Sequence, residues 1–412
     1  MVETKFKDSE LGLIPEDWEV KKISEGIAEV KSGKRLPTGY YVTNNKTLYP
    51  YIRVIDMYKG GINMDNIMYV PEKAYPYIKN YRIFKEDIFI SVAGTLGLVG
   101  KIPNCLDGAN LTENANRFTK ITCDRDYLLY YLCSPYIQDI IFSEQTIGAQ
   151  PKLALIRIRN FRIVLPKQKK EQAAIATALN DVDHLITALD KKIEKRKLIK
   201  QGVMQQLLTG KKRLPGFTGK WVEKRLCEFC HFVGGGTPDT QKKEYWNGNI
   251  PWISSSDISM DDIYNISISR FITLEAVKNS ATFICPPNTI LLITRVGVGK
   301  LAISERLICT SQDFTNIIVL DANERFVALQ LQTIMKQNKE NTQGTSIKGI
   351  TMEKVKELII TLPPTKEEQS AIAAILSDMD KEIEVLEVKR DKFKTIKQGM
   401  MQKLLTGQIR LI

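Results

Sequence analysis

The side chains able to act as acids, bases or metal ligands are few and scattered along the chain. Histidine, which titrates near neutral pH, occurs only at His184 and His231. His231 follows Cys227 and Cys230, a spacing that suits haem attachment or half of a zinc site. We expect neither, because the opening residues do not resemble an export signal and no second Cys-x-x-Cys pair completes a zinc site. The sequence predicts instead a small strand with buried thiols, and no metal.

Motifs for nucleotide binding or methyl transfer are not recognisable. The glycine-rich runs at residues 93–101 and 295–300 lack the strand–GxGxxG–helix context of a dinucleotide site, so we predict loops or strand bends there. Pro286-Pro287 is preceded by Cys285 and followed by Asn288, which does not match the Asn/Asp-Pro-Pro-aromatic signature of methyltransferases. We therefore predict no catalytic residue. An enzyme with its own active site stays an alternative, and it predicts chemistry by the chain alone.

The charge of the chain favours a polyanionic partner such as nucleic acid. The 412 residues carry a formal charge of +12, and the pI is about 9.1. Residues 166–214 hold 12 Lys and Arg against 5 Asp and Glu, so more than half of the excess lies in one segment. Seven scattered cysteines argue against a disulfide framework, and no apolar run is long enough to span a membrane. We expect a cytoplasmic protein without a membrane partner.

Polar side chains suited to reading DNA bases occur in the predicted loops. Arginine and lysine read guanine, asparagine and glutamine read adenine, and serine and threonine can serve either base. Each of these residues alone is also compatible with an ordinary protein surface. The candidates are Arg53, Lys101, Gln150, Lys152, Arg157 and Arg159 in the first half, and Ser254, Ser255, Arg295, Lys300, Thr345 and Lys348 in the second.

An internal duplication organises the elements that carry these residues. Residues 171–214 align without gaps on residues 368–411, at an offset of 197, and 25 of the 44 positions are identical. The regions before them correspond more weakly, as in Tyr-Pro-Tyr-Ile-Arg at 49–53 and Ile-Pro-Trp-Ile-Ser at 250–254. The predicted unit is thus a globular domain followed by a long helix, used twice. The predicted boundaries are 1–165, 166–214, 215–363 and 364–412.

Each duplicated helix has an apolar seam with coiled-coil spacing. The seam positions recur at steps of four and three residues, which predicts a partner helix for each. We expect the two helices to pair with each other, antiparallel and about a pseudo-twofold axis, as a spacer of fixed length. The seam residues are Ile175, Leu179, Val182, Ile186, Leu189 and Ile193, and Ile372, Leu376, Met379, Ile383, Leu386 and Phe393.

The first helix also carries a basic band, for which three interpretations stay open. It is a solvated helix face, a contact for DNA phosphates, or a docking surface for a partner subunit. The band comprises Lys191, Lys192, Lys195, Arg196, Lys197 and Lys200, followed by Lys211, Lys212 and Arg213.

The domains are predicted to be α+β, with short strands between glycine and asparagine turns. Two amphipathic stretches, Asp126–Ile141 and Arg325–Gln337, are predicted to be helices. Candidate strands are Ile88–Ala93, Leu98–Ile102, Phe161–Pro166, Thr289–Thr294, Lys300–Ser304 and Asn316–Leu320.

The chain resembles the specificity subunit of type I restriction–modification systems over nearly its whole length. The resemblance rests on the opening SELGLIPEDWE, on the PxxxxEQ and PPTKEEQ helix starts, and on the endings KQGVMQQLLTG and KQGMMQKLLTG. It implies two target-recognition domains, each reading one half of an interrupted DNA site, with an antiparallel pair of coiled-coil helices that fixes the gap.

The resemblance also implies partners and a division of labour. The chain would bind double-stranded DNA and recruit two modification (methyltransferase) subunits, which use S-adenosylmethionine to methylate adenine, and restriction subunits, which translocate and cleave DNA. It would hold no cofactor and no active site of its own. Recognition domains of this family share little motif, so base contacts cannot be transferred from the family to this sequence. A coiled-coil scaffold that binds only proteins stays a third hypothesis.

Overall fold

The computed structural model describes residues 5–143, 152–260, 262–341 and 349–411. The chain divides into two compact units. Unit 1 combines Met1–Asp190 with Val388–Ile412, and unit 2 is Lys191–Glu387. Unit 2 is therefore continuous in sequence, whereas unit 1 is assembled from two segments, the second of which comes from the end of the chain.

Two long helices, α5 (Lys169–Leu207) and α9 (Lys366–Leu404), contribute to both units, and each is 39 residues long. Both end in the same way, because Gly210 and Gly407 adopt positive φ angles of 67° and 72°. Corresponding backbone bonds then close the last turns: the N–H of Lys212 donates to Gln206 and that of Ile409 to Lys403. This geometry is typical of glycine-terminated helices, and it explains the repeated Thr-Gly at each end.

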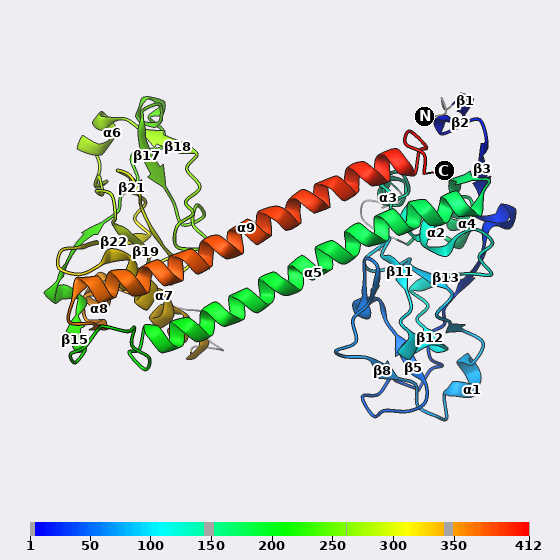
Figure 1. The fold of residues 1–412 in the computed structure, drawn as a ribbon, viewed down its shortest axis with the longest axis horizontal. Helices are drawn as coiled ribbons and strands as arrows, with labels where there is room; N and C mark the ends of the chain where they lie inside the picture. Colours follow the sequence, from blue (N-terminus) through cyan, green and yellow to red (C-terminus); the bar gives the residue numbers. More distant parts are fainter. Residues whose placement is uncertain (1–4, 144–151, 261, 342–348, 412) are drawn as a thin grey trace. The chain divides into compact units, whose positions relative to one another are not determined.

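Segments of α5 and α9 lie side by side and antiparallel within each unit (Figure 1). In each unit, the ion pair farthest along α5 involves the α9 residue with the lowest number, as expected for antiparallel helices. The pairs in unit 1 are Asp183–Lys397 (2.7 Å) and Asp190–Arg390 (3.6 Å); those in unit 2 are Arg196–Glu382 (2.9 Å), Lys197–Glu387 (2.6 Å) and Lys200–Asp380. The predicted antiparallel pairing of the helices is thus confirmed.

Two four-stranded sheets in unit 1 position the loops that are predicted to read DNA bases. One four-stranded sheet has the order β11-β10-β13-β4, and its inner strand β10 is buried along its whole length, in keeping with the apolar residues Ile88, Phe89 and Ile90. A second sheet has the order β8-β5-β12-β9, in which β5 and β12 are parallel. The strands of these sheets are β4 (Glu29–Ser32), β5 (Pro50–Ile52), β8 (Met68–Tyr69), β9 (Arg82–Ile83), β10 (Ile88–Ser91), β11 (Val99–Lys101), β12 (Ala109–Leu111) and β13 (Ala115–Thr119). A separate two-stranded sheet consists of β6 (Met57–Tyr58) and β7 (Gly61–Ile62).

Unit 2 repeats this plan. Its sheets have the orders β16-β22-β19-β20 and β18-β17-β21, and β17 and β21 are parallel like β5 and β12. The strands are β16 (Cys230–Gly234), β17 (Ile250–Ile253), β18 (Arg270–Ile272), β19 (Ile290–Ile293), β20 (Leu301–Ile303), β21 (Cys309–Thr310) and β22 (Phe314–Val319).

A two-stranded antiparallel ribbon precedes each long helix. It is formed by β3 (Trp18–Lys22) with β14 (Arg162–Pro166) in unit 1, and by β15 (Val222–Arg225) with β23 (Ile359–Leu362) in unit 2. A hairpin of β1 (Phe6–Ser9) and β2 (Gly12–Pro15) opens the described chain. The shorter helices are α1 (Tyr75–Ile78), α2 (Arg125–Leu132), α3 (Pro135–Ser143) and α4 (Leu155–Arg159), then α6 (Leu274–Lys278), α7 (Glu324–Asn341) and α8 (Met352–Lys356).

The predicted strands are found, but the first predicted helix is divided. The stretch Asp126–Ile141 forms α2 and α3, which are separated at Cys133 and Ser134. Pro135 explains the division, because proline disfavours helical backbone in the residue before it and fits the first turn of a new helix. The corresponding segment of unit 2 has no proline and stays one helix, α7.

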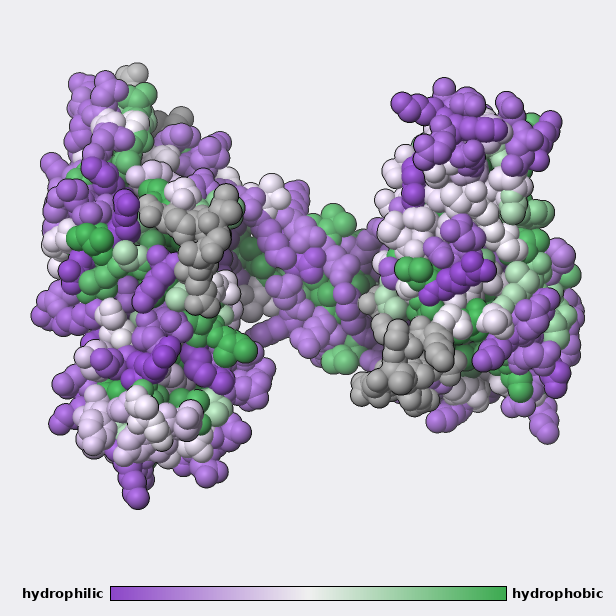
Figure 2. All heavy atoms as spheres, turned by 180° about the vertical axis from the view of Figure 1, so that it is seen from behind, coloured by the Kyte–Doolittle hydropathy of each residue, from purple (hydrophilic) through white to green (hydrophobic). Residues whose placement is uncertain are grey.

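Each unit has a core that reaches from its sheets to the long helices. In unit 1 this core includes Trp18 and Phe118 together with Ile175 of α5 and Leu404 of α9. In unit 2 it includes Phe326 and Leu376. Polar residues predominate on the face shown in Figure 2, with small apolar patches between them. Among the described residues, no helix is long and apolar enough to cross a membrane.

Candidate nucleic-acid interface

The predicted seam residues of the two helices are all shielded to some degree. Eight of them are buried, and Val182, Ile186, Met379 and Phe393 are half-buried. The buried ones are Ile175, Leu179, Leu189, Ile193, Ile372, Leu376, Ile383 and Leu386. Burial of one such side chain stabilises a fold by about 1.5–3 kcal/mol, so the seam is a substantial part of the scaffold.

Buried glutamates at the helix starts bind arginines that follow the end of the other long helix. In unit 1, Arg410 donates to both carboxylate oxygens of Glu171, which is 4% exposed, and to both of Asp17. In unit 2, Arg213 donates to both oxygens of Glu368 at 2.6 and 2.7 Å. A tryptophan ring lies against each guanidinium. The distance from Arg410 Cζ to the ring centroid of Trp18 is 5.4 Å, and that from Arg213 Cζ to the ring centroid of Trp221 is 5.8 Å. The hydrogen bonds to Glu171 and Asp17 raise the pKa of Arg410, and the hydrogen bond from Arg410 lowers the pKa of Asp17.

The glutamine that follows each of these glutamates ties the helix to the domain before it. The side chain of Gln172 donates to the carbonyl of Pro166 at 2.7 Å and accepts from the backbone N–H of Asp124 at 2.7 Å. Gln369 makes the equivalent bonds in unit 2, to Pro363 (3.2 Å) and from Asn323 (2.7 Å). The repeated Glu-Gln pair therefore has a structural role in both units, which the sequence reasoning did not identify.

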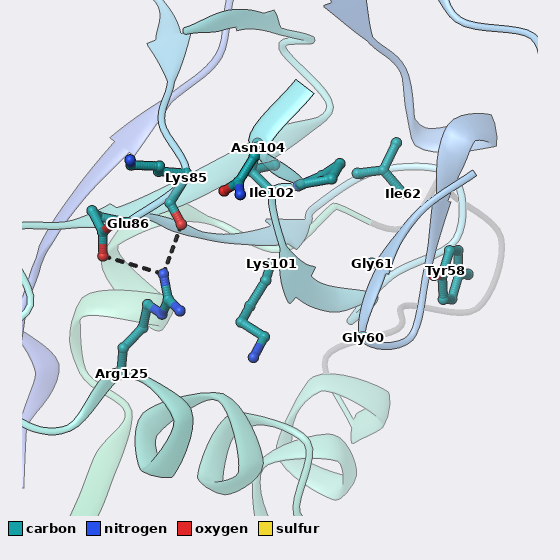
Figure 3. A pocket seen from close by; sticks show the side chains of 11 residues that line it. Tyr58, Gly60, Gly61, Ile62, Lys85, Glu86, Lys101, Ile102, Asn104 and Arg125 are labelled. Carbon is teal, nitrogen blue, oxygen red and sulfur yellow. Dashed lines mark hydrogen bonds and ion pairs between the residues drawn. The ribbon is translucent and has the colours of Figure 1, made fainter. Parts of the chain in front are cut away.

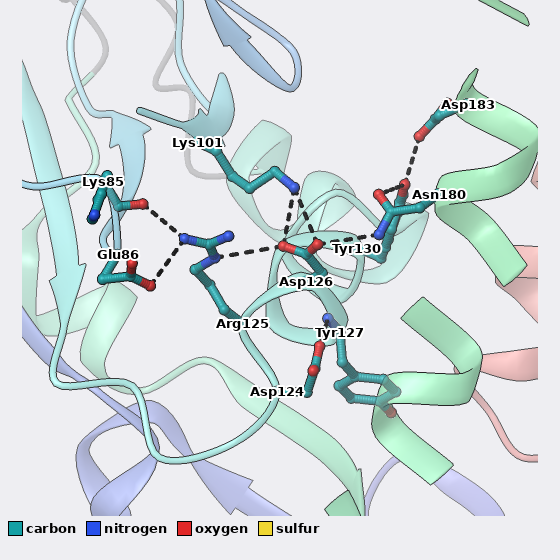
Figure 4. Close-up of polar contacts among 10 residues, drawn as sticks. All are labelled: Lys85, Glu86, Lys101, Asp124, Arg125, Asp126, Tyr127, Tyr130, Asn180 and Asp183. Atoms are coloured by element: carbon teal, nitrogen blue, oxygen red, sulfur yellow. Dashed lines mark hydrogen bonds and ion pairs between the residues drawn. The ribbon is translucent and has the colours of Figure 1, made fainter. Parts of the chain in front are cut away.

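Unit 1 has an additional polar network between its domain and the helix pair (Figure 4). Lys101 contacts both oxygens of Asp126 at 3.1 Å, and Asn180 of α5 donates to the same carboxylate at 3.1 Å. The Tyr130 hydroxyl lies 2.9 Å from Asn180 Oδ1 and donates to Asp183 at 2.7 Å. Burial and the bond to this carboxylate raise the pKa of Tyr130.

The corresponding region of unit 2 also has an ion pair between α5 and α9. Lys200 and Asp380 correspond to Lys397 and Asp183 at the repeat offset, and they are also paired. Burial raises the pKa of Asp380 despite this lysine. Leu329 stands where unit 1 has Tyr130, so the hydroxyl is missing there. The two domains thus share the contacts of the Glu-Gln pair, but only the first has the hydroxyl contacts of Tyr130 at this position.

A surface hollow of about 500 Å³ in unit 1 borders this network (Figure 3). Its lining includes Lys101 and Arg125, both of which are already ion-paired. Arg125 donates to the carbonyl of Lys85 at 2.7 Å and contacts Glu86 at 3.3 Å. Because acidic neighbours compensate the two central cations, the hollow is not a strong anion site.

Two of the predicted base contacts lie in equivalent turns and are held there by an aspartate. After β5, Asp56 accepts hydrogen bonds from the backbone and the guanidinium of Arg53, at 2.8 and 3.0 Å. After β17, Asp257 accepts from the backbone and the hydroxyl of Ser254, at 2.7 and 3.1 Å. These internal bonds shape the turns and engage the Arg53 guanidinium inside the domain. Ser255, in the second turn, is half-buried.

The other predicted contacts differ in their surroundings. Lys152, Arg157 and Arg295 are exposed, Lys300 is half-buried, and exposed Arg159 donates to the carbonyl of Val30 at 3.4 Å. The glycine-rich run 295–300 connects β19 to β20, and the run 93–101 connects β10 to β11 and continues into β11 up to Lys101, which agrees with the predicted loops for the connecting residues. Gln150, Thr345 and Lys348 lie outside the described residues.

Half of the basic band on α5 pairs with α9. Arg196, Lys197 and Lys200 make the unit 2 ion pairs given above, whereas Lys191, Lys192 and Lys195 are exposed. The cysteine motif forms no metal cluster among the residues that the structure covers. Burial raises the pKa of Cys230 on β16 to about 12, while Cys227 is exposed.

Comparison with known proteins places both units in one family. Residues 15–197 and 218–394 each match the type I restriction modification DNA specificity domain. Over 434 aligned residues the chain is 26% identical to a protein of Methanocaldococcus jannaschii described as the type I restriction enzyme MjaX specificity subunit, with 99% of this chain and 97% of that protein covered. It is 28% identical over 219 residues to the EcoR124I/EcoR124II specificity subunit of Escherichia coli, covering 51% of this chain and 52% of that one.

Solved structures share the fold. The S subunit of a type I restriction–modification system from M. genitalium matches with a TM-score of 0.59 at 16% identity, covering 94% of this chain and 96% of that one. A second structure, which concerns complex assembly and conformational transition of the type I R-M system, matches with a TM-score of 0.56 at 18% identity. The match covers 96% of this chain and 99% of that one.

Two related specificity domains, each followed by a copy of the repeated helix, define a DNA-recognition subunit, a class of protein that selects a sequence and leaves catalysis to other subunits. The chain belongs to the type I restriction modification DNA specificity domain family and is a specificity subunit of a type I system.

Proposed function

We propose that each unit of this chain reads one half of an interrupted DNA site, and that the paired helices set the gap between the halves. The observation that carries this proposal is the presence of two specificity-domain matches, at 15–197 and 218–394, in one chain. Their helices keep 25 of 44 positions, while the domains differ much more. Divergent domains on a shared scaffold are expected when the two domains read different sequences.

The proposed partners are double-stranded DNA, two methyltransferase subunits docked on the helices, and restriction subunits. The methyltransferase subunits would bring S-adenosylmethionine, so this chain needs no cofactor. The exposed lysines of the basic band, Lys191, Lys192 and Lys195, would lie near DNA phosphates.

Mapping methylated adenines in the host genome, with and without this gene, tests the proposal. We expect one bipartite adenine-methylation motif to disappear on deletion and to return on complementation. If the methyltransferase subunits are expressed and no motif depends on this gene, the proposal is wrong.

A further inference from the structure

Four loops of unit 1 meet at the carboxyl ends of the parallel strands β5 and β12. We call them the loop platform: residues 33–35, 53–56, 92–97 and 112–114. Backbone bonds join them to one another and to the strand ends: Lys34 N–H to Leu111 (2.8 Å), Gly33 N–H to Ala115 (3.0 Å), Thr112 N–H to Ile52 (3.1 Å) and Val92 N–H to Asn114 (2.7 Å).

Unit 2 has the same platform, at residues 235–237, 254–257, 294–299 and 311–313. Each of the four bonds has a counterpart between corresponding residues. The counterparts are Gly236 N–H to Thr310 (2.8 Å), Gly235 N–H to Phe314 (3.4 Å), Ser311 N–H to Ile253 (2.9 Å) and Thr294 N–H to Asp313 (2.8 Å). The backbone of the platform is therefore the same in both units although their sequences have diverged.

A glycine is needed at one corner of each platform. A Cβ atom at Gly33 would lie 2.0 Å from the carbonyl oxygen of Thr112, and one at Gly235 would lie 2.0 Å from that of Ser311. No other residue type fits such a close approach of two backbones. The duplicated domains thus retain the residue that brings the first and last loops of the platform together.

The side chains carried by these two loops differ between the units in a chemically specific way. In unit 1, Arg35 donates to Glu113 at 2.7 Å, and the Arg35 side chain is 79% exposed. At the corresponding positions of unit 2, exposed Thr237 donates to the amide oxygen of exposed Gln312. An ion pair in one domain is replaced by a hydroxyl–amide pair in the other, on the same backbone.

The environment of the first pair keeps it charged and presented to solvent. Burial raises the pKa of Glu113, but the hydrogen bonds from Arg35 and Thr112 outweigh this effect and leave that pKa lowered. The Glu113 carboxylate holds the Arg35 guanidinium through its Nε, so the terminal nitrogens of Arg35 remain available for bonds. Arginine presented in this way can bond both O6 and N7 of guanine, and a carboxylate can accept from N4 of cytosine.

We propose that the loop platform is the surface that reads DNA bases, and that these two pairs determine specificity. Arg35 with Glu113 would read a G·C base pair in one half-site. Gln312 with Thr237 would read an A·T base pair in the other, because an amide side chain is bidentate to adenine and the threonine methyl suits the methyl of thymine. The proposal rests on the proposed function and names the residues that carry it out.

Exchanging the pairs in the full chain, together with its methyltransferase subunits, tests this proposal. One variant carries Arg35→Thr and Glu113→Gln, and the reciprocal variant carries Thr237→Arg and Gln312→Glu. The readout is the methylated motif, together with the affinity for duplexes varied at each base pair. We expect each exchange to change the preference at one base pair of one half-site only, on the order of 10- to 100-fold, while the other half-site is read as before.

The matched control is an exposed ion pair at the opposite end of the same sheet. Lys120 and Glu29 pair at the far ends of β13 and β4, and Lys120→Asn with Glu29→Gln should leave every base preference unchanged. Asparagine is chosen because Lys120 has a positive φ of 52°. Arg35→Lys serves as the conservative variant, since lysine keeps the charge but loses the bidentate geometry.

The outcomes separate the two proposals. If the parent complex shows no sequence preference at all, the proposed function itself fails. If it reads a bipartite site, yet neither exchange alters any base pair, the platform is not the reading surface. Should an exchanged variant not assemble, Arg35→Lys decides: relaxed discrimination at one G·C position supports the proposal, and parental discrimination at every position overturns it.

Discussion

Arg410 holds both carboxylate oxygens of Glu171, although 239 residues separate them along the chain. The contact joins a residue beyond Leu404, the C-terminal end of α9, to the first turn of α5 inside unit 1. Its counterpart in unit 2 joins Arg213 to Glu368 across 155 residues. Each long helix therefore has a buried glutamate in its first turn, and this glutamate pairs with an arginine that lies beyond the end of the other helix.

Replacing Arg410 should destabilise unit 1 in particular. Arg410→Ala leaves Glu171 buried without its cation, which costs about 3 kcal/mol, because a buried charge loses its partner. Hydrogen exchange should show faster opening of β3 and β14, with β15 and β23 unchanged. Arg213→Ala is the matched variant and should reverse that pattern. If Arg410→Ala loosens β15 and β23 as much as β3 and β14, the contact is not local to unit 1.

The Tyr130 hydroxyl should stabilise the attachment of the first domain to α5. Tyr130→Phe removes the hydroxyl that contacts Asn180 and donates to Asp183. We expect the free energy of unfolding to fall by about 1–2 kcal/mol, because partly buried polar partners lose a hydrogen bond. Urea unfolding measures the change. Tyr136→Phe, which alters a tyrosine that is 38% exposed, is the control and should be neutral. Equal effects of the two variants would contradict the assigned role.

The Asp126 network should make unit 1 sensitive to acid. Burial raises the pKa of Asp126, but bonds from Lys101 and Asn180 dominate and lower it below its ordinary value. A carboxylate with a depressed folded pKa stabilises the fold above its unfolded pKa of about 4, and this contribution is lost as the pH falls through the folded value. Lys101→Met should therefore be less stable than the parent at pH 6. The difference should shrink as the pH falls below about 4, and a difference that stays constant with pH would exclude this linkage.

The exposed half of the basic band should contribute to DNA affinity through counterion release. Lys191, Lys192 and Lys195 are exposed, whereas Arg196, Lys197 and Lys200 are paired with acids of α9. Changing the three exposed lysines to alanine should reduce the slope of log affinity against log salt by about one for each phosphate that the protein no longer neutralises. The control changes Lys211 and Lys212, two exposed lysines that follow the band, to alanine and measures the same slope. An unchanged slope, with loss of methyltransferase binding, would assign the band to docking instead.

Lengthening both helices tests their role as a spacer. A second copy of residues 186–192 in α5 and of 383–389 in α9 preserves the seam and adds about 10 Å to each helix. The recognised gap should grow by about 3 base pairs at 3.4 Å each, as read from the methylation motif. Insertion into α5 alone breaks the register of the seam and should destabilise the pair. A gap that stays the same after the double insertion would rule out the spacer role.

The sequence predicted the repeat, the helices and most central strands, because these depend on local periodicity. Ile175 and Leu179 of α5 are assigned to one seam by their spacing alone, and the three consecutive apolar residues Ile88–Ile90 of β10 indicate a buried strand. Pro135, which divides a predicted helix in two, shows how one residue changes such a pattern.

The site was harder to predict, because a cation's partner depends on contacts between distant segments. Arg53 and Lys101 were chosen by residue type, but Asp56 and Asp126 engage both inside the domain. Arg35 was missed, because Glu113 lies 78 residues away and no local pattern joins them. The sequence does contain one signal for the contacts at the helix ends. Glu171 and Glu368 occupy equivalent positions of the repeat, and so do Arg213 and Arg410.

Unit 1 is built from two separate segments of the chain, and this determines the order in which a ribosome can complete the two units. Unit 2 is one continuous segment, so every residue of it has been synthesised before Val388 is added. The core of unit 1 also requires Met401, Leu404 and Leu405, which are translated after all of unit 2. The domain whose synthesis starts first is therefore the last to be finished, and a nascent chain must keep its first domain incomplete until translation reaches these residues.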